Sequence, residues 1–159
     1  MGIYLGMPHG NGPFPAVVVS QAAGGVDEFI QSIVDQLAAE GYAAAAPELY
    51  HRTTKEIERT TGKTRRQLLD DMEIVADIDA TVSFLQSHPS VNSRQIGVTG
   101  FCMGGRVAWL AAVSNPDFKV CVPFYGGFIT DTWGQATESP FELSKNINCP
   151  MMFHFGEVD

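Results

Sequence analysis

The sequence predicts a single α/β domain over residues 1–159, with a mostly parallel sheet and helices on both faces. Short apolar runs alternate with amphipathic segments, which is the pattern of repeated βαβ units. The runs are continuous, as at residues 16–20, whereas strands exposed on one face alternate apolar and polar residues. A glycine-rich turn at 100–105 joins one run directly to a helical pattern. These observations predict a three-layer architecture.

The elements follow in order along this pattern. The first helix should be capped by Asp27 and stop at Gly41. An exposed polar excursion at 53–66 follows, and then a long helix that should end before Pro89. A third helix should run from Met103 to about Val113. The long helix is expected to bury Leu68, Met72, Val75, Val82 and Leu85. The strands are expected at 16–20, 42–46, 95–99, 119–124 and 151–155.

The last strand leads into the turn at 156–159, where a further helix would normally follow. We therefore expect a domain truncated at its C-terminus, lacking the last helical segment. Such a loss would expose an apolar sheet face, from which we expect self-association.

The composition excludes several classes of function. A net charge of -8 disfavours binding to nucleic acid or to an anionic membrane surface. No apolar run is long enough for a membrane span, and the N-terminus lacks the pattern of a signal peptide. Three widely spaced cysteines suggest neither a disulfide framework nor a zinc site, and reduced thiols favour the cytoplasm.

The turn at 100–105 reads Gly-x-Cys-x-Gly-Gly, a nucleophile elbow with Cys102 at its centre. Small neighbours let the strand and the helix approach each other closely. The sulfur would lie at a helix N-terminus, where the helix dipole favours the reactive thiolate. The N–H of Met103 would point at the oxygen of an attacked carbonyl. For Cys121 and Cys149, in or beside apolar strands, we expect a role as small core residues.

Several segments together resemble the dienelactone hydrolase family, also called carboxymethylenebutenolidases, of the α/β-hydrolase superfamily. The most specific is Gly97–Gly105, which contains the cysteine elbow. The others are residues 15–19, 40–43, 47–50, 71–73, 124–126 and 150–159, so the resemblance covers nearly the whole chain.

The resemblance implies the α/β-hydrolase fold and an ester or lactone hydrolase that needs neither metal nor organic cofactor. Cys102 matches the nucleophile and Asp159 matches the acid of a Cys, His, Asp triad. The N–H groups of Met103 and Ala23 match the oxyanion hole. The substrate would be a small-molecule ester or lactone.

Three features depart from the family pattern. The family's histidine follows the acid, and His9, His51, His88 and His154 all precede Asp159. Of these, only His51 is expected at the same sheet rim as Cys102, as a weak candidate for a substitute base, whereas His154 is expected in the core.

Ala22 stands where the best-known members have a glutamate that contacts the nucleophile. Thr60 stands where they bind the substrate carboxylate with arginine. For the nearby Arg59, Arg65 and Arg66, a solvated surface is the preferred interpretation.

Two alternatives stay open at this point. The chain could be a non-catalytic α/β-hydrolase domain that binds a small molecule or a protein, which the Ala22 departure favours and the thiol elbow disfavours. It could also be a redox-sensing protein, if Cys121 lies near Cys102 in space.

Overall fold

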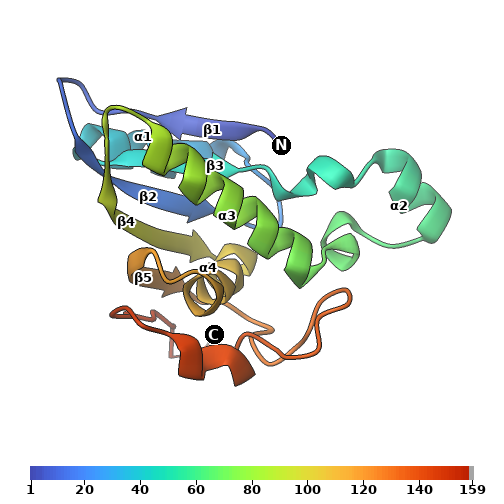
Figure 1. Ribbon diagram of the computed structural model, residues 1–159. Helices are drawn as coiled ribbons and strands as arrows, with labels where there is room; N and C mark the ends of the chain where they lie inside the picture. The colour runs from blue at the N-terminus through green and yellow to red at the C-terminus, as the bar shows by residue number, and fades with distance from the viewer. Residues whose placement is uncertain (158–159) are drawn as a thin grey trace.

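The computed structural model describes residues 1–157, which are built around one five-stranded sheet (Figure 1). The strands lie in the order β1-β3-β2-β4-β5. Their bounds are Ile3–Gly6 (β1), Phe14–Ser20 (β2), Ala43–Pro47 (β3), Val91–Phe101 (β4) and Phe118–Phe124 (β5). β1 pairs with β3 in antiparallel register, and all other pairs are parallel. The predicted mostly parallel sheet is confirmed.

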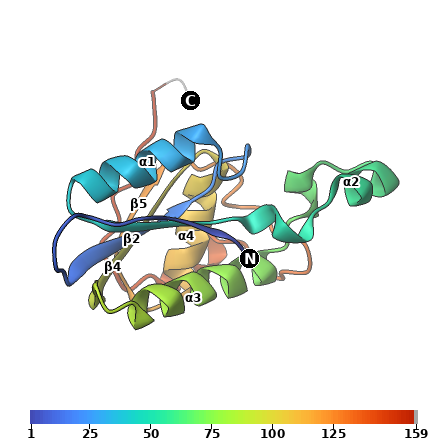
Figure 2. The ribbon, with the colours of Figure 1, turned by 90° about the horizontal axis from the view of Figure 1, so that it is seen from above.

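Helices cover both faces of this sheet. Figure 2 shows α1 (Glu28–Ala39) on one side of the strands, and α3 (Asp71–Ser87) and α4 (Met103–Ser114) on the other. The short helix α2 (Lys55–Thr61) projects away from the sheet and buries no side chain. The three-layer α/β architecture is therefore confirmed, as is the exposed excursion. A single domain over residues 1–159 that is truncated at its C-terminus stays a prediction.

Local capping sets where α1 begins. The carboxylate of Asp27 accepts a hydrogen bond from the N–H of Ile30 at 3.1 Å, as an N-cap should. Ile30 and Val34 are fully buried in a cluster with Val19, Ala44 and Ala46. After the helix, Gly41 takes φ 93°, a left-handed conformation that favours glycine.

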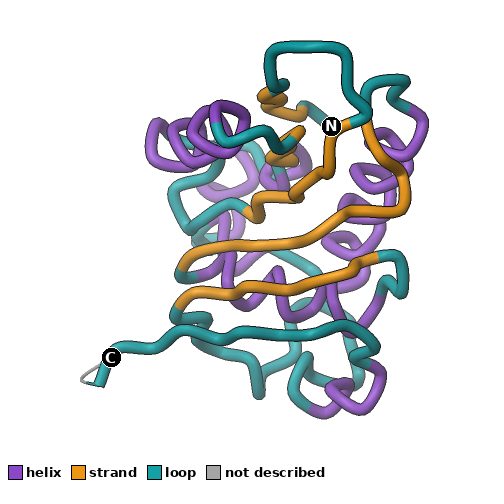
Figure 3. The backbone as a smooth tube through the Cα atoms, turned by 90° about the vertical axis from the view of Figure 1, so that its left-hand side faces the viewer, coloured by secondary structure: helices purple, strands orange, loops and turns teal. Residues whose placement is uncertain are grey.

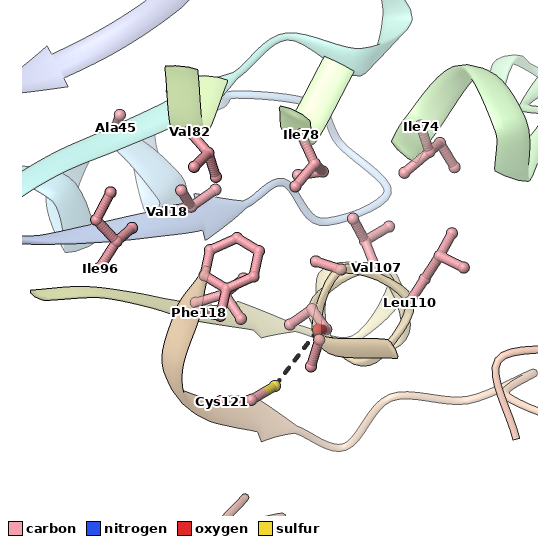
Figure 4. Close-up of a cluster of buried hydrophobic side chains, with 14 of the residues drawn as sticks. Val18, Ala45, Ile74, Ile78, Val82, Ile96, Val107, Leu110, Phe118 and Cys121 are labelled. Atoms are coloured by element: carbon pink, nitrogen blue, oxygen red, sulfur yellow. Dashed lines mark hydrogen bonds between the residues drawn. The ribbon is translucent and has the colours of Figure 1, made fainter. Parts of the chain in front are cut away.

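The larger core lies beneath α3 and α4 (Figure 4). Its side chains come from elements that are distant in sequence, among them Val18 of β2, Ile78 of α3, Val107 of α4 and Phe118 of β5. Cys121 lies in the same core, where its thiol donates to the carbonyl of Ala108 at 3.3 Å. Its predicted role as a core cysteine is confirmed.

The buried face of α3 agrees with the expected one at Val82 and Leu85 but not at its start. The helix begins only at Asp71, because the Asp70 carboxylate caps it by accepting from the N–H of Met72 at 2.8 Å. Leu68 therefore precedes the helix, and Met72 is 67% exposed. The buried apolar residues of α3 are Ile74, Ile78, Val82 and Leu85.

The C-terminal segment runs parallel to β5 without forming a regular strand (Figure 3). Isolated bridges join Cys121 to Met151 and Phe124 to His154. The segment leaves His154 exposed, with its ring stacked on Phe124 at a centroid distance of 4.6 Å. The expectation of a core histidine was wrong, because nothing in residues 1–157 covers this edge.

Candidate active site

Cys102 forms a sharp turn between β4 and α4. Its backbone angles are φ 56° and ψ -121°, and its side chain is exposed. Two hydrogen bonds hold this geometry: Cys102 N–H donates to Phe124 O at 3.1 Å, and Gly105 N–H donates to Cys102 O at 2.9 Å. A positive φ on a residue with a Cβ costs about 1–3 kcal/mol and persists only where the surroundings enforce it.

The surrounding glycines enforce this turn by close packing. A Cβ on Gly100 would collide with the backbone of Gly104, and one on Gly104 would collide with the carbonyl of Ser20. A Cβ on Gly105 would lie 2.5 Å from the carbonyl of Phe124. The first turn of α4 is thus wedged between the ends of β2 and β5, which holds Cys102 above the sheet.

A cavity of about 420 Å³ opens at this turn. It is lined by Ala23, Arg66, Cys102, Met103, Tyr125, Gly127, Phe128 and Trp133. Three of the four residues that the resemblance selects therefore line one cavity: Cys102, Met103 and Ala23. The fourth, Asp159, lies outside the residues that the structure describes.

The two expected oxyanion donors are placed as backbone groups beside the cavity. Met103 is the first residue of α4, where an N–H has no carbonyl partner within the helix. Ala23 is exposed in the turn closed by the bond from Gly25 N–H to Ala22 O at 3.0 Å. Within residues 1–157, the N–H of Ala23 donates to no backbone carbonyl. Neither N–H is thus committed to a backbone carbonyl in the part of the chain that the structure describes.

The solvated surface expected for Arg66 was wrong, because this side chain lines the cavity. Arg66 is half-buried, with its guanidinium 5.1 Å from the centre of the Phe128 ring, whereas Arg59 and Arg65 are exposed as expected. Tyr125, Phe128 and Trp133 form an aromatic wall. Their position after β5, at the C-terminal edge of the sheet that holds Cys102, was the available signal.

A buried ion pair holds this wall in place. Arg106 is fully buried, and its Nη1 and Nη2 donate to the two Asp71 carboxylate oxygens at 2.7 and 2.9 Å. The same guanidinium donates to the carbonyls of Phe128 at 2.9 Å and Asp131 at 2.7 Å. It lies 3.7 Å from the centre of the Trp133 ring, and the backbone N–H of Trp133 donates to Asp71 Oδ2 at 3.0 Å. The pair therefore joins α3, α4 and the loop that forms the wall.

His51 is not brought to the cavity. Its Nε2 lies 3.0 Å from Asp77 Oδ2, and the same oxygen accepts from Arg52 Nη1 at 2.6 Å. Within residues 1–157, no histidine lines the cavity. His51 as a substitute base gains no support from this geometry.

Cys121 offers no redox partner to Cys102. Cys121 is fully buried and bonded to Ala108, whereas Cys102 is exposed at the cavity. Burial, together with the neighbouring Cys149, raises the pKa of the Cys121 thiol to about 12. Its thiol therefore stays protonated near neutral pH, which disfavours disulfide exchange.

The buried ion pair gives a stability prediction. Asp71→Asn should lower the free energy of unfolding by about 3–5 kcal/mol, because the Arg106 charge would be left buried without a counter-charge. Urea denaturation measures the change. Glu73→Gln is the matched control, since Glu73 is half-exposed on the same helix and should change stability by about 0.5 kcal/mol or less. Equal stability of the two variants would contradict the prediction.

Comparison with known proteins places this geometry in a family. The model of the dienelactone hydrolase family matches residues 1–159. A protein of Methylorubrum extorquens named "Putative carboxymethylenebutenolidase" is 34% identical over 161 residues, which cover 98% of this chain and 55% of that protein. A protein of the same name from Escherichia coli strain K12 is 35% identical over 153 residues, covering 94% of this chain and 56% of that protein.

A solved structure agrees with the sequence comparison. The crystal structure of a "Putative Dienelactone Hydrolase" from Klebsiella pneumoniae superposes with a TM-score of 0.81 at 30% identity, covering 96% of this chain and 72% of that chain. This chain spans little more than half the length of the two curated relatives. By the family model and by these relatives, the chain belongs to the dienelactone hydrolase family.

Proposed function

We propose that the chain carries the nucleophile of an ester or lactone hydrolase, with Cys102 as that nucleophile. One observation carries the proposal: Cys102 is exposed in a positive-φ turn, at a cavity that Met103 and Ala23 also line. Family membership supports the hydrolase class. Neither a metal nor an organic cofactor is required by this chemistry.

The reaction would proceed through a thioester. The Cys102 thiolate attacks the carbonyl carbon, and the π electron pair moves onto oxygen, where the N–H groups of Met103 and Ala23 stabilise it. Collapse of this intermediate breaks the carbon–oxygen bond and expels the alcohol oxygen, which takes the proton that the thiol gave up on forming the thiolate. Water then adds to the thioester, expels the thiolate and releases the carboxylic acid.

We propose from the family pattern that a histidine is the base that activates water in the hydrolysis of the thioester. Asp159 would accept a hydrogen bond from a histidine that follows it in the chain and would fix that histidine's tautomer. Ala22 cannot replace the glutamate of other members, because its side chain neither donates nor accepts hydrogen bonds.

The cavity walls support a class of substrate. Tyr125, Phe128 and Trp133 offer flat apolar surfaces, and Arg66 offers a cation beside Phe128. We propose an ester or lactone with a planar apolar part and a carboxylate that pairs with Arg66.

A binding module without catalysis is the second candidate. The observation that favours it is that no histidine within residues 1–157 lines the cavity. It would use the same aromatic wall and Arg66 to hold a small molecule. Acylation of Cys102 by an ester distinguishes the two candidates, because a hydrolase forms the thioester and a binding module does not.

The first experiment is hydrolysis of p-nitrophenyl acetate by this chain and by Cys102→Ala. Turnover that vanishes in Cys102→Ala would support the thiol hydrolase. Without turnover, alkylation by iodoacetamide faster than that of a free thiol would show an intact elbow. Peptide mapping assigns the label, and Cys121 should stay unlabelled because its raised pKa leaves little thiolate. An unreactive Cys102 would overturn catalysis and favour the binding module.

Substrate charge gives a second test. Arg66→Met should slow acylation of Cys102 by mono-p-nitrophenyl glutarate about fivefold, since a half-buried pairing is worth about 1 kcal/mol. Acylation by neutral p-nitrophenyl acetate should not change. Arg59→Met removes an exposed cation outside the cavity and is the matched control. An equal effect on both esters would contradict carboxylate recognition by Arg66.

Self-association and a cytoplasmic location also stay predictions. Self-association is supported by the apolar residues Val120, Met152 and Phe155, which are exposed along β5 and the segment beside it. A cytoplasmic location is supported by the three free cysteines. No helix within residues 1–157 could cross a bilayer. Size-exclusion chromatography with light scattering should show a mass that rises with concentration. A monomer at all concentrations would contradict self-association.

A further inference from the structure

Tyr50 lies in a rigid position between the two segments that bear the oxyanion donors. It belongs to the short 3-10 helix Leu49–Arg52, which directly follows β3, and it is 4% exposed. Its own N–H donates to Glu48 Oε1 at 3.0 Å, and the N–H of Leu49 donates to Gln21 Oε1 at 2.9 Å. The backbone beneath the ring is therefore fixed by two side-chain bonds.

The Tyr50 hydroxyl contacts both segments. It donates to the carbonyl of Ala23 at 3.0 Å and lies 3.5 Å from the sulfur of Met103. The hydroxyl has one proton, and a carbonyl is a stronger acceptor than a thioether. The bond to Ala23 is therefore the dominant one, and the Met103 side chain packs against the same oxygen.

The turn that contains Ala23 has few other attachments. Ala22 and Ala23 have side chains that form no hydrogen bonds, and the bond from Gly25 N–H to Ala22 O only closes the turn on itself. The Tyr50 ring lies beneath the turn, since a Cβ on Gly25 would be 3.5 Å from its Cδ2 atom. Tyr50 thus supports the turn through both its ring and its hydroxyl.

The hydroxyl keeps its proton under working conditions. Burial raises the pKa of Tyr50 above its ordinary value, against opposing effects of Arg65 and Arg66. The guanidinium of Arg65 lies 4.7 Å from the ring centre and covers its outer face. The donor bond to Ala23 therefore persists at the pH where a thiolate attacks.

We propose that Tyr50 is a positioning residue of the oxyanion hole, whose hydroxyl fixes Ala23 so that the Ala23 and Met103 N–H groups meet at one oxygen. The inference rests on the proposed function. Under this inference, Tyr50 matters only when the thiolate attacks a carbonyl group. Attack on a saturated carbon develops no oxyanion, so there the same thiolate should not depend on Tyr50.

The test compares two electrophiles on wild type and Tyr50→Phe. Phenylalanine keeps the ring and its packing and removes only the hydroxyl. The burst of p-nitrophenol from p-nitrophenyl acetate, which reports acylation of Cys102, should slow about tenfold, less than the about 10²–10³ for complete loss of an oxyanion donor. Alkylation of Cys102 by iodoacetamide should stay within about twofold of wild type, since no oxyanion forms.

Tyr42→Phe is the matched control, because Tyr42 is exposed and lies outside the cavity. It should leave both rates unchanged. Unchanged acylation in Tyr50→Phe would overturn the inference while the proposed function stands. Equal slowing of both reactions would overturn it as well, since that result indicates a general distortion of the elbow. Absence of acylation in wild type, with alkylation intact, would overturn the proposed function and the inference with it.

Discussion

The buried pair of Arg106 and Asp71 is the interaction on which the cavity depends. A fully buried guanidinium needs a counter-charge and hydrogen-bond acceptors. Here all three nitrogens of Arg106 donate, to the two Asp71 carboxylate oxygens and to two loop carbonyls. Because those carbonyls belong to the loop after β5, the charge that is buried in the helical layer also fixes the aromatic wall. Loss of the pair would affect stability and ligand binding together.

The elbow depends on a different kind of constraint. There, close packing of backbone on backbone forces Cys102 into its conformation, and no side chain of the turn contributes a hydrogen bond. Tyr50 then fixes the opposite rim. Backbone packing and backbone hydrogen bonds thus hold Cys102, whereas a side-chain hydroxyl holds the loop that contains Ala23.

The sequence predicted what is decided locally. The Asp27 cap and the glycine elbow depend on residues within a few positions of each other, and both were confirmed. The buried face of α3 was predicted correctly at Val82 and Leu85 and wrongly at its start, where Leu68 and Met72 were chosen in place of Ile74 and Ile78. Ile74 and Ile78 are buried because they pack against residues of other elements, which the sequence pattern of one helix does not reveal. Arg106 was not foreseen as a buried residue, because its partner Asp71 is 35 residues away. The place of Arg66 at the cavity was not predictable either, because it depends on the path that the chain takes through the exposed excursion.

The exposed excursion at residues 53–66 adds little to folding stability, yet it determines where Arg66 lies. Residues 55–61 bury nothing, so changes of length or composition there have little cost in folding free energy. Yet the chain returns from α2 through Arg66 to the rim of the cavity. Insertions in this arm would shift the cation relative to Cys102 while the sheet and the elbow stay intact. Ligand preference can therefore diverge within this fold through an element that the core does not constrain.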